Sequence, residues 1–277
     1  MQTEGKNTEK KGHLHPISLM IGDISHTMTR LGFDVVDGPE IESEYYNFDA
    51  LNVPKDHPSR DMQDTFFLKE NSGDQKQEEA RKLPRTHTSG VWAKYMKENT
   101  QRGVFPPYAM VAPGKVFRNE ATDATHEAQF FQVDGMMLGK DVHLGHLRGT
   151  LGALFSGVFG KETEVRFRQS FFPFTEPSVE IDMRCFKCEG KGLNQSDGSP
   201  DPAKRGGGCP TCKTTGYIEV MGAGMIHPKV LLECGIDPRE YQGFAFGGGI
   251  DRLAMLKWGI EDVRFLYNGD LRVVNQF

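Results

Sequence analysis

Long hydrophobic runs are missing from this 277-residue chain. No apolar stretch approaches the roughly 18 residues that a membrane span needs, and the polar N-terminus has no signal-peptide core. Positive charge is not in excess, because the formal net charge is -5 and the pI is near 6.0, which argues against a generally basic nucleic-acid-binding surface. We therefore expect a soluble, cytoplasmic protein that holds any nucleic acid locally or through a partner.

Cysteine is also scarce, and four of the five cysteines lie in one short segment. Cys185-Phe-Lys-Cys188 and Cys209-Pro-Thr-Cys212 are separated by residues rich in Gly, Ser, Lys and Asp, with almost nothing apolar to form a core. In a cytosolic chain, two such turns favour metal ligation over disulfides and predict a tetrahedral zinc site. Four thiolates leave no open position, so we expect structural rather than catalytic zinc. Cys234 lies apart and is expected to be an ordinary buried residue.

Length and patterning predict an α+β chain with one large domain at 15–277, a zinc-binding insert at 185–216 within it, and a disordered tail at 1–14. The expected helices begin near Pro16, Glu42, Gly90, Asp141 and Pro228. The expected strands cover residues 33–36, 108–111, 115–119, 128–138, 164–168, 176–183 and 217–221, and a further strand runs through glycines into a helix over 243–255.

An acidic strand follows an aromatic turn. Alternation from residue 176 places Glu176, Ser178, Glu180 and Asp182 on one face of this strand, and Phe172-Pro-Phe174 stands just before it. Rings beside carboxylates suggest an apolar pocket next to a site for a cation or a metal ion. The alternative is a core strand with a solvated face.

A polar hairpin is predicted between residues 115 and 138. Arg118 and Glu120 lie at one flank, while Phe130, Gln132 and Asp134 share one face of the second strand. Such a set could grip phosphate, amine and base edges together, although a solvated sheet face is the alternative. The stretch 85–90 offers hydroxyl and imidazole groups before a helix, which suits either capping or ligand binding.

Several of these segments resemble the motifs of a known family, the class II aminoacyl-tRNA synthetases. Residues 243–253 (Gly-Phe-Ala-Phe-Gly-Gly-Gly-Ile-Asp-Arg-Leu) are similar to motif 3, residues 114–120 with 130–135 to motif 2, and residues 31–44 to motif 1. Three further stretches narrow the resemblance to the alpha subunits of bacterial phenylalanyl-tRNA synthetases, over roughly residues 15–277 apart from the insert. They are residues 85–90, 171–178 and 222–228.

The resemblance implies a six- to seven-stranded antiparallel sheet flanked by helices. It also implies an enzyme that binds ATP, Mg2+ and L-phenylalanine. The phenylalanine carboxylate would attack the α-phosphate of ATP, and the aminoacyl group would then pass to tRNA(Phe). A beta subunit is the implied partner, in an alpha2-beta2 heterotetramer.

Residue roles follow from the resemblance position by position. Arg118 would hold the α-phosphate and the substrate carboxylate, with Arg252 and Phe130 on the two faces of adenine. Glu120 would meet the adenine amine, His126 the outer phosphates, and Glu219 with Glu176 the magnesium. The phenylalanine would be bound by His87, Ser89, Gln132 and Asp134 at its polar end and by Phe172, Phe174 and Ala245 around its ring.

Three departures from the family pattern stand out. Asp134 replaces the usual Glu and is one methylene shorter. Residues before His15 could not form the long coiled coil with which the family's alpha chains begin, so tRNA binding by this chain alone is not expected. The zinc insert is additional to the best-known bacterial forms, and we expect it to serve structure, tRNA contact or subunit contact.

Three alternatives remain open at this stage. A related class II ligase for phosphoserine or pyrrolysine would keep motifs 2 and 3 but not the aromatic pair Phe172 and Phe174. A non-catalytic paralogue would be expected to lose Arg118, Arg252 or Glu219. A zinc-ribbon nucleic-acid-binding protein would explain the cysteines but not the other motifs.

Overall fold

A computed structural model describes residues 12–61, 64–69, 81–160, 163–193, 208–209 and 211–277. Most of the predicted tail and the centre of the predicted zinc insert lie outside these residues. No helix in the described part of the chain is long and apolar enough to span a membrane.

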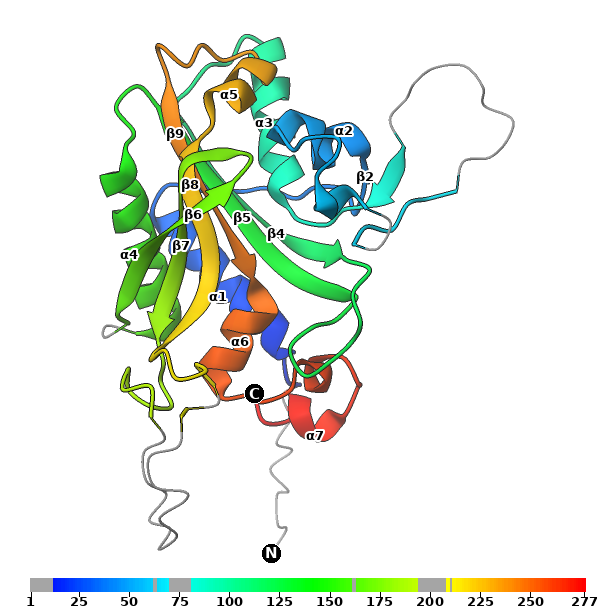
Figure 1. Cartoon of the computed structure of the whole chain (residues 1–277), viewed down its shortest axis with the longest axis vertical. Coiled ribbons are helices and arrows are strands. Elements are labelled where there is room, and N and C mark those ends of the chain that lie inside the picture. Colours follow the sequence, from blue (N-terminus) through cyan, green and yellow to red (C-terminus); the bar gives the residue numbers. More distant parts are fainter. Residues whose placement is uncertain (1–11, 62–63, 70–80, 161–162, 194–207, 210) are drawn as a thin grey trace, which may run out of the picture.

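A seven-stranded sheet forms the centre of the molecule (Figure 1). Neighbouring strands in the sheet are antiparallel except at one edge, where β1 runs parallel to β4. The prediction of a fully antiparallel sheet is therefore wrong at that edge, and the sheet is mixed. The strand order is β1 (Asp34–Val35), β4 (Tyr108–Phe117), β5 (Gln129–Gly139), β9 (Gln242–Gly249), β8 (Tyr217–Ile226), β7 (Thr175–Arg184) and β6 (Val165–Phe172).

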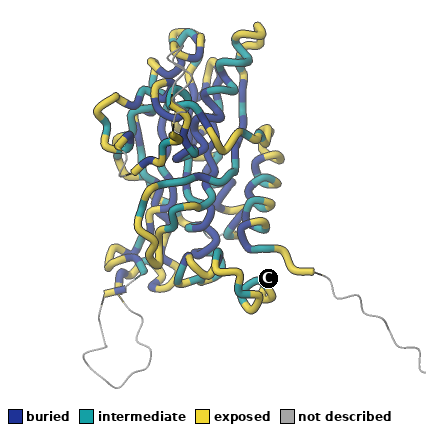
Figure 2. Tube along the Cα trace, turned by 90° about the vertical axis from the view of Figure 1, so that its right-hand side faces the viewer, coloured by how far each residue is buried: buried dark blue, intermediate teal, exposed yellow. Residues whose placement is uncertain are grey.

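Helices cover both faces of the sheet. On one face a buried cluster joins the sheet to α1 (Pro16–Arg30), α4 (Leu144–Phe159) and α6 (Ile250–Trp258). On the other face a second cluster joins it to α3 (Ser89–Gln101) and α5 (Pro228–Glu233). Figure 2 shows the buried segments running through the middle of the molecule. The remaining elements are α2 (Glu44–Asn47), α7 (Leu271–Val274), the short strands β2 (Ile41–Ser43) and β3 (Lys82–Pro84), and the 3-10 turns η1 (Asp49–Leu51), η2 (Pro58–Arg60) and η3 (Val263–Leu266).

Alternation along β5 and β9 decides which side chains reach which face. Val133 and Phe246 pack in the α1 cluster, whereas Met136 and Ala245 pack in the α3 cluster. The prediction that Phe131 and Val133 face away from Phe130, Gln132 and Asp134 is confirmed, because the first two join the α1 cluster and the other three line a cavity on the α3 side.

Three predicted elements, one helix and two strands, differ from the structure. The helix expected over 42–51 is broken into β2, α2 and η1, with Phe48 in a non-helical conformation between the last two. The strands expected at 108–111 and 115–119 are one strand, β4. β1 pairs only with Met110 and Val111, so Pro113 lies beyond that ladder and its missing N–H group leaves no bond to β1 unmade.

The predicted alternation of β7 holds over residues 179–183 and is wrong at Glu176. Val179, Ile181 and Met183 pack in the α1 cluster, while Glu180 and Asp182 both contact Arg168 on the other face. The pairing of β7 with β8 is irregular between Thr175 and Ser178, where β7 has one extra residue. Such an irregularity shifts the side chains on one side of it to the other face. As a result Ser178 is buried while Glu176 is exposed, so the two residues do not share one acidic face.

Candidate active site

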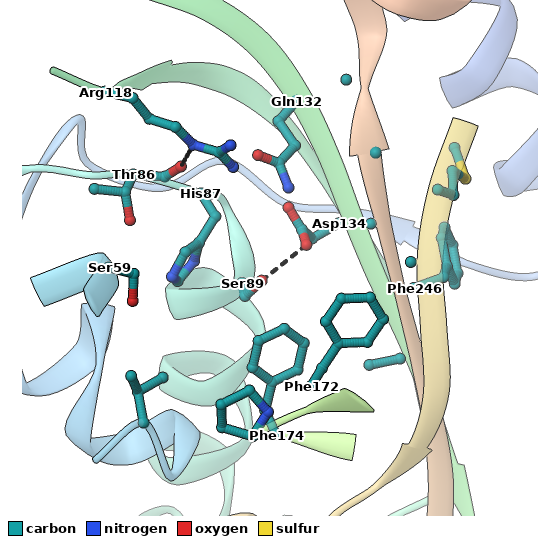
Figure 3. Close-up of a pocket in the computed structure, with 18 of the residues that line it drawn as sticks. Ser59, Thr86, His87, Ser89, Arg118, Gln132, Asp134, Phe172, Phe174 and Phe246 are labelled. Atoms are coloured by element: carbon teal, nitrogen blue, oxygen red, sulfur yellow. Dashed lines mark hydrogen bonds between the residues drawn. The ribbon is translucent and has the colours of Figure 1, made fainter. Parts of the chain in front are cut away.

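A cavity of about 650 Å3 lies between the sheet and the layer formed by η1 and α3. Its volume is in the usual range for small-molecule sites, about 300–1,000 Å3. Figure 3 shows the cavity with polar side chains toward one end and phenylalanine rings toward the other. The lining includes these residues singled out from the sequence: His87, Ser89, Arg118, Glu120, Phe130, Gln132, Asp134, Phe172, Phe174, Glu219, Ala245 and Arg252.

Asp134 is the buried carboxylate of this cavity. Its Oδ2 accepts hydrogen bonds from the backbone N–H and the hydroxyl of Thr88, and its Oδ1 accepts one from the Ser89 hydroxyl at 2.8 Å. Burial raises the pKa of Asp134, and the three donors oppose this shift. A buried carboxylate at the wall of a cavity is a site for a cationic group, because the cation would offset the cost of burial.

Two more polar side chains of the cavity have an atom without a partner. Gln132 Oε1 and His87 Nδ1 are buried and accept or donate no hydrogen bond among the described residues. Burial and the nearby Arg118 lower the pKa of His87 to about 3, so its imidazole is neutral at pH 7. Unpaired buried polar atoms are costly, and both atoms are therefore candidates for ligand contacts.

An aromatic end completes the cavity opposite the arginines. The rings of Phe172 and Phe174 are stacked with centroids 5.9 Å apart and planes 13° apart. Gly222 lies against this pair, because a Cβ atom there would come within 2.7 Å of the Phe172 ring. Ala245 faces the same space from β9, so this end offers an apolar site of limited length.

The opposite end holds two arginines and an aromatic ring. The Arg118 guanidinium lies 5.1 Å from the centroid of the Phe130 ring, donates from Nε to the Thr86 carbonyl at 3.2 Å, and is 3.9 Å from Glu120. Arg252, in the first turn of α6, lines the same space. Fixed guanidinium groups beside a ring suit a ligand that carries phosphate and a flat base.

His126 lies slightly apart from this group. It lines a smaller adjoining cavity of about 140 Å3, which shares Arg118, Glu120, Phe130 and Arg252 with the main one. Its ring is 3.0 Å from the Asp123 carboxylate. The hairpin loop therefore extends the arginine end outward.

Carboxylates gather at the β7–β8 side of the site around Arg168. The guanidinium of Arg168 contacts Glu180 at 2.6 Å, Asp182, and Glu219 at 3.8 Å. Burial, followed by the charge of Glu180, raises the pKa of Glu219. These oxygens are ligands of the type that Mg2+ prefers.

Glu176 does not belong to this carboxylate group. It is absent from the cavity lining, and its carboxylate is 3.3 Å from His227. Glu219 is paired across the ladder with Asp182. Asp182 lies six positions after Glu176 on β7, which corresponds to a distance on the order of 15–20 Å along the strand. The expectation that Glu176 and Glu219 share one ion is corrected on this geometry.

The four paired cysteines come together as predicted from their spacing. The sulfur atoms of Cys185, Cys188, Cys209 and Cys212 lie within 4.8 Å of one another, and all four residues are buried. Backbone N–H groups of Gly192 and Gly216 point to the sulfurs of Cys188 and Cys212 at 3.3 and 3.2 Å. Grouped sulfurs that accept N–H bonds fit a tetrahedral thiolate site. Cys234 is buried apart from them, as expected.

Sequence reasoning missed the residues that hold the site together. Asn47 binds both the N–H group and the hydroxyl of Thr86, and the buried Arg85 donates to the carbonyls of Gly38 and Lys115. Thr88 holds Asp134. These residues carry no periodic signal, and their partners are distant in sequence. The part of the cavity wall formed by Val53, His57, Ser59, Asp64 and Thr65 was also missed, since that stretch of sequence is typical of a plain loop.

Comparison with known proteins places the chain in a family. Residues 2–277 match the model of the tRNA synthetases class II core domain (F). The phenylalanine–tRNA ligase alpha subunit of Bacillus licheniformis is 45% identical over 268 residues, which is 97% of this chain and 70% of that protein. The corresponding subunit of Bacillus mycoides is 45% identical over 273 residues, 99% of this chain and 71% of that protein.

A solved structure supports the same fold. The crystal structure of pyrrolysyl-tRNA synthetase from Desulfitobacterium hafniense matches with a TM-score of 0.63 and 16% identity, covering 92% of this chain and 74% of that one. At this identity the match speaks for the fold alone. The chain therefore has the class II synthetase core fold, and by its sequence it belongs to the family of phenylalanine–tRNA ligase alpha subunits.

Proposed function

We propose that this chain activates L-phenylalanine with ATP and transfers it to tRNA(Phe), as the alpha subunit of a heteromeric ligase. The observation that carries the proposal is one cavity in which the buried Asp134 separates an aromatic end from an arginine end. This order matches the order of groups in an aminoacyl adenylate: an apolar ring, an ammonium group, and then phosphate with adenine. Family membership supports the same reading.

The amino acid fits the aromatic end. Its ring would lie among Phe172, Phe174 and Ala245, and its ammonium group would bind Asp134 and the free Oε1 of Gln132. His87 and Ser89 would contact the remaining polar atoms, with His87 in its neutral form. An apolar pocket of limited length admits phenylalanine and excludes tyrosine mainly because a hydroxyl has no room.

ATP fits the arginine end. Arg118 would hold the α-phosphate and the attacking carboxylate, while adenine would lie between Phe130 and Arg252 with its amine at Glu120. His126 would contact the outer phosphates from the smaller cavity. In the reaction a carboxylate oxygen forms a bond to the α-phosphorus, and the bond from that phosphorus to the pyrophosphate oxygen breaks.

No nucleophilic side chain is needed for this step. The chain's residues bind the two substrates in line and neutralise charge that builds up on the phosphoryl oxygens. Arg118 and Arg252 supply fixed positive charge for that purpose. Thr88, through Asp134, fixes the position of the ammonium group and hence of the carboxylate that attacks.

Magnesium fits the carboxylates near Arg168. Glu219 lines the cavity, and Glu180 is its neighbour on β7, so we propose these two as the metal-binding residues. When bound, Mg2+ would neutralise phosphate charge. The exposed Glu176 would take no part in this site.

Zinc fits the four cysteines. We propose that the chain is a catalytic domain at 15–277, with an insert at 185–216 that binds one structural Zn2+ through Cys185, Cys188, Cys209 and Cys212. The insert lies between β7 and β8, the strands that carry Glu180 and Glu219. Its metal would therefore stabilise the strand ends beside the carboxylates. A beta subunit in an alpha2-beta2 assembly and a cytoplasmic location complete the proposal.

Phenylalanine-dependent exchange of pyrophosphate into ATP tests the activation step, with tyrosine as control. If this chain without a beta subunit catalyses exchange with phenylalanine but not with tyrosine, the result would support a self-sufficient catalytic chain. Exchange only after the beta subunit is added would support a site that needs its partner. No exchange in either case, from folded protein, would refute the proposal.

A further inference from the structure

Asp251, which precedes Arg252 in α6, is buried at 5% exposure; it is part of the wall of the smaller cavity but does not line the main one. Its Oδ2 accepts a hydrogen bond from the backbone N–H of Phe131 at 2.7 Å. The regular β5–β9 ladder ends at the pair Gln132 and Gly249. The carboxylate therefore replaces the next strand carbonyl and extends the ladder by one bond into the helix.

This bond joins the neighbours of two site residues. Phe131 lies between Phe130 and Gln132 on β5, and Asp251 immediately precedes Arg252. Phe130 and Arg252 are the residues proposed to lie on the two faces of adenine. Together with the adjacent ladder pair Gln132 and Gly249, this hydrogen bond holds the two backbones that carry the sides of the slot for the base.

Tyr267 holds the other oxygen of the same carboxylate. Its hydroxyl donates to Asp251 Oδ1. Because two donors satisfy the two oxygens, the carboxylate is fixed in direction as well as in place. Tyr267 follows η3, whose residues Val263 and Leu266 are buried in the α1 cluster, so this support is anchored in the core.

The same C-terminal segment also holds the hairpin loop. The N–H group of Val263 donates to the carbonyl of Ala124 at 2.9 Å, two residues from His126. The ring of His15 bonds to the carbonyl of Leu266 at 2.8 Å. Figure 1 shows the C-terminal segment in red beside the green β4–β5 loop. Residues 263–267 therefore touch the loop, α6 and the start of α1.

From these contacts we infer that Asp251 and Tyr267 are positioning residues for ATP, which act through the backbone of Phe131 on the slot between Phe130 and Arg252. The inference rests on the proposed function and deepens it, because the residues proposed above to bind ATP, phenylalanine or a metal do not include Asp251 or Tyr267. It predicts an effect on the nucleotide end alone, since the phenylalanine end is held separately by Thr88 and Asn47.

The test measures affinity for a non-hydrolysable ATP analogue with Mg2+ by titration calorimetry, and the KM for phenylalanine by pyrophosphate exchange. Tyr267→Phe and Asp251→Ala should weaken analogue binding roughly 10- to 150-fold, the range for loss of a hydrogen bond to a charged group, and should leave the phenylalanine KM within about twofold. Asp251→Asn, which retains an acceptor for Phe131, should restore most of the affinity. Tyr108→Phe removes a buried hydroxyl bonded to the Val104 carbonyl and should change neither value.

Several results would overturn the inference. Wild-type analogue affinity in folded Tyr267→Phe and Asp251→Ala would show that the pair serves stability alone. Equal losses for the analogue and for phenylalanine would point to a general disturbance of the fold. If Asp251→Ala does not fold, the analogue affinity of Tyr267→Phe decides the test. A wild-type protein that binds no analogue either alone or with the beta subunit added would refute the proposed function, and this inference with it.

Discussion

Replacing Asp134 by Asn separates the charge of this group from its hydrogen bonds. The amide oxygen can take the place of Oδ2 and accept from the N–H group and hydroxyl of Thr88. The amide nitrogen can take the place of Oδ1 and donate to the Ser89 hydroxyl, which both donates and accepts. The variant therefore keeps the local geometry and loses only the negative charge.

The expected functional result is a loss confined to phenylalanine. A hydrogen bond to a charged group contributes about 1.5–3 kcal/mol, which corresponds to a drop of roughly 10- to 150-fold in kcat/KM. The KM for ATP should stay near the wild-type value, because Arg118 and Arg252 are unchanged. Pyrophosphate exchange at varied phenylalanine and varied ATP measures both constants.

The expected effect on stability has the opposite sign. Burial raises the pKa of Asp134, so the folded state binds its proton more tightly than the unfolded state does. The wild type then loses stability as pH rises from the unfolded pKa, about 3.9, through the folded pKa. Asp134→Asn should have the higher free energy of unfolding at pH 7, and the difference should vanish at a pH below the unfolded value.

Asp237→Asn is the matched control. It removes one charge from a carboxylate paired with Arg239 outside the cavity, and should leave the phenylalanine kinetics unchanged. A wild-type phenylalanine KM in Asp134→Asn would refute the ammonium assignment. A lower melting temperature at pH 7 would refute the claim that the buried charge destabilises the fold.

Three further results are expected. Gly247→Ala would place a Cβ atom 2.1 Å from Asp134 Oδ1 and should raise the phenylalanine KM roughly 5- to 150-fold, since overpacking costs about 1–3 kcal/mol. Gly149→Ala, where space is open, is the control, and equal kinetics of the two variants would contradict the geometry. Ala245→Gly should open the end of the ring pocket and admit para-substituted phenylalanines in a competitive adenylation assay, and unchanged selectivity would exclude that placement. Purified protein should hold one zinc per chain by elemental analysis. Cys209→Ser should lose the metal and melt at a lower temperature, whereas Cys234→Ser should keep the metal. A structural metal would be refuted if Cys209→Ser retained zinc and its melting temperature, or if the chelated protein kept its fold and its aminoacylation activity.

Periodic and closely spaced signals were read well from the sequence. The helix from Pro16, the shared face of Phe130, Gln132 and Asp134, and the closeness of the cysteines within each C-x-x-C turn follow from local spacing, because the backbone itself brings such residues together. The meeting of the two turns was predicted from the four ligands that one zinc ion needs. Motif resemblance added Arg252, which no periodicity would single out.

Irregular and long-range features could not be read in this way. The broken register of β7 separates Glu176 from Glu180 and Asp182, and nothing in the alternating letters marks it. The bond from Asp251 to Phe131 spans 120 positions in the chain. A single polar residue with a distant partner looks the same in sequence as one that faces solvent.

The insert between β7 and β8 also has a use in protein engineering. Its two C-x-x-C turns are joined by backbone hydrogen bonds. The N–H group of Cys185 donates to the carbonyl of Gly216 and the N–H group of Cys209 to that of Gly192, and Leu193 pairs with Gly208. Leu193 and Gly208 therefore lie side by side at one bridged point. A longer segment grafted there would cost only about 0.6 kcal/mol for each doubling of its length. A peptide tag or a fluorescent label could thus be carried within the chain, leaving both chain ends free for other fusions.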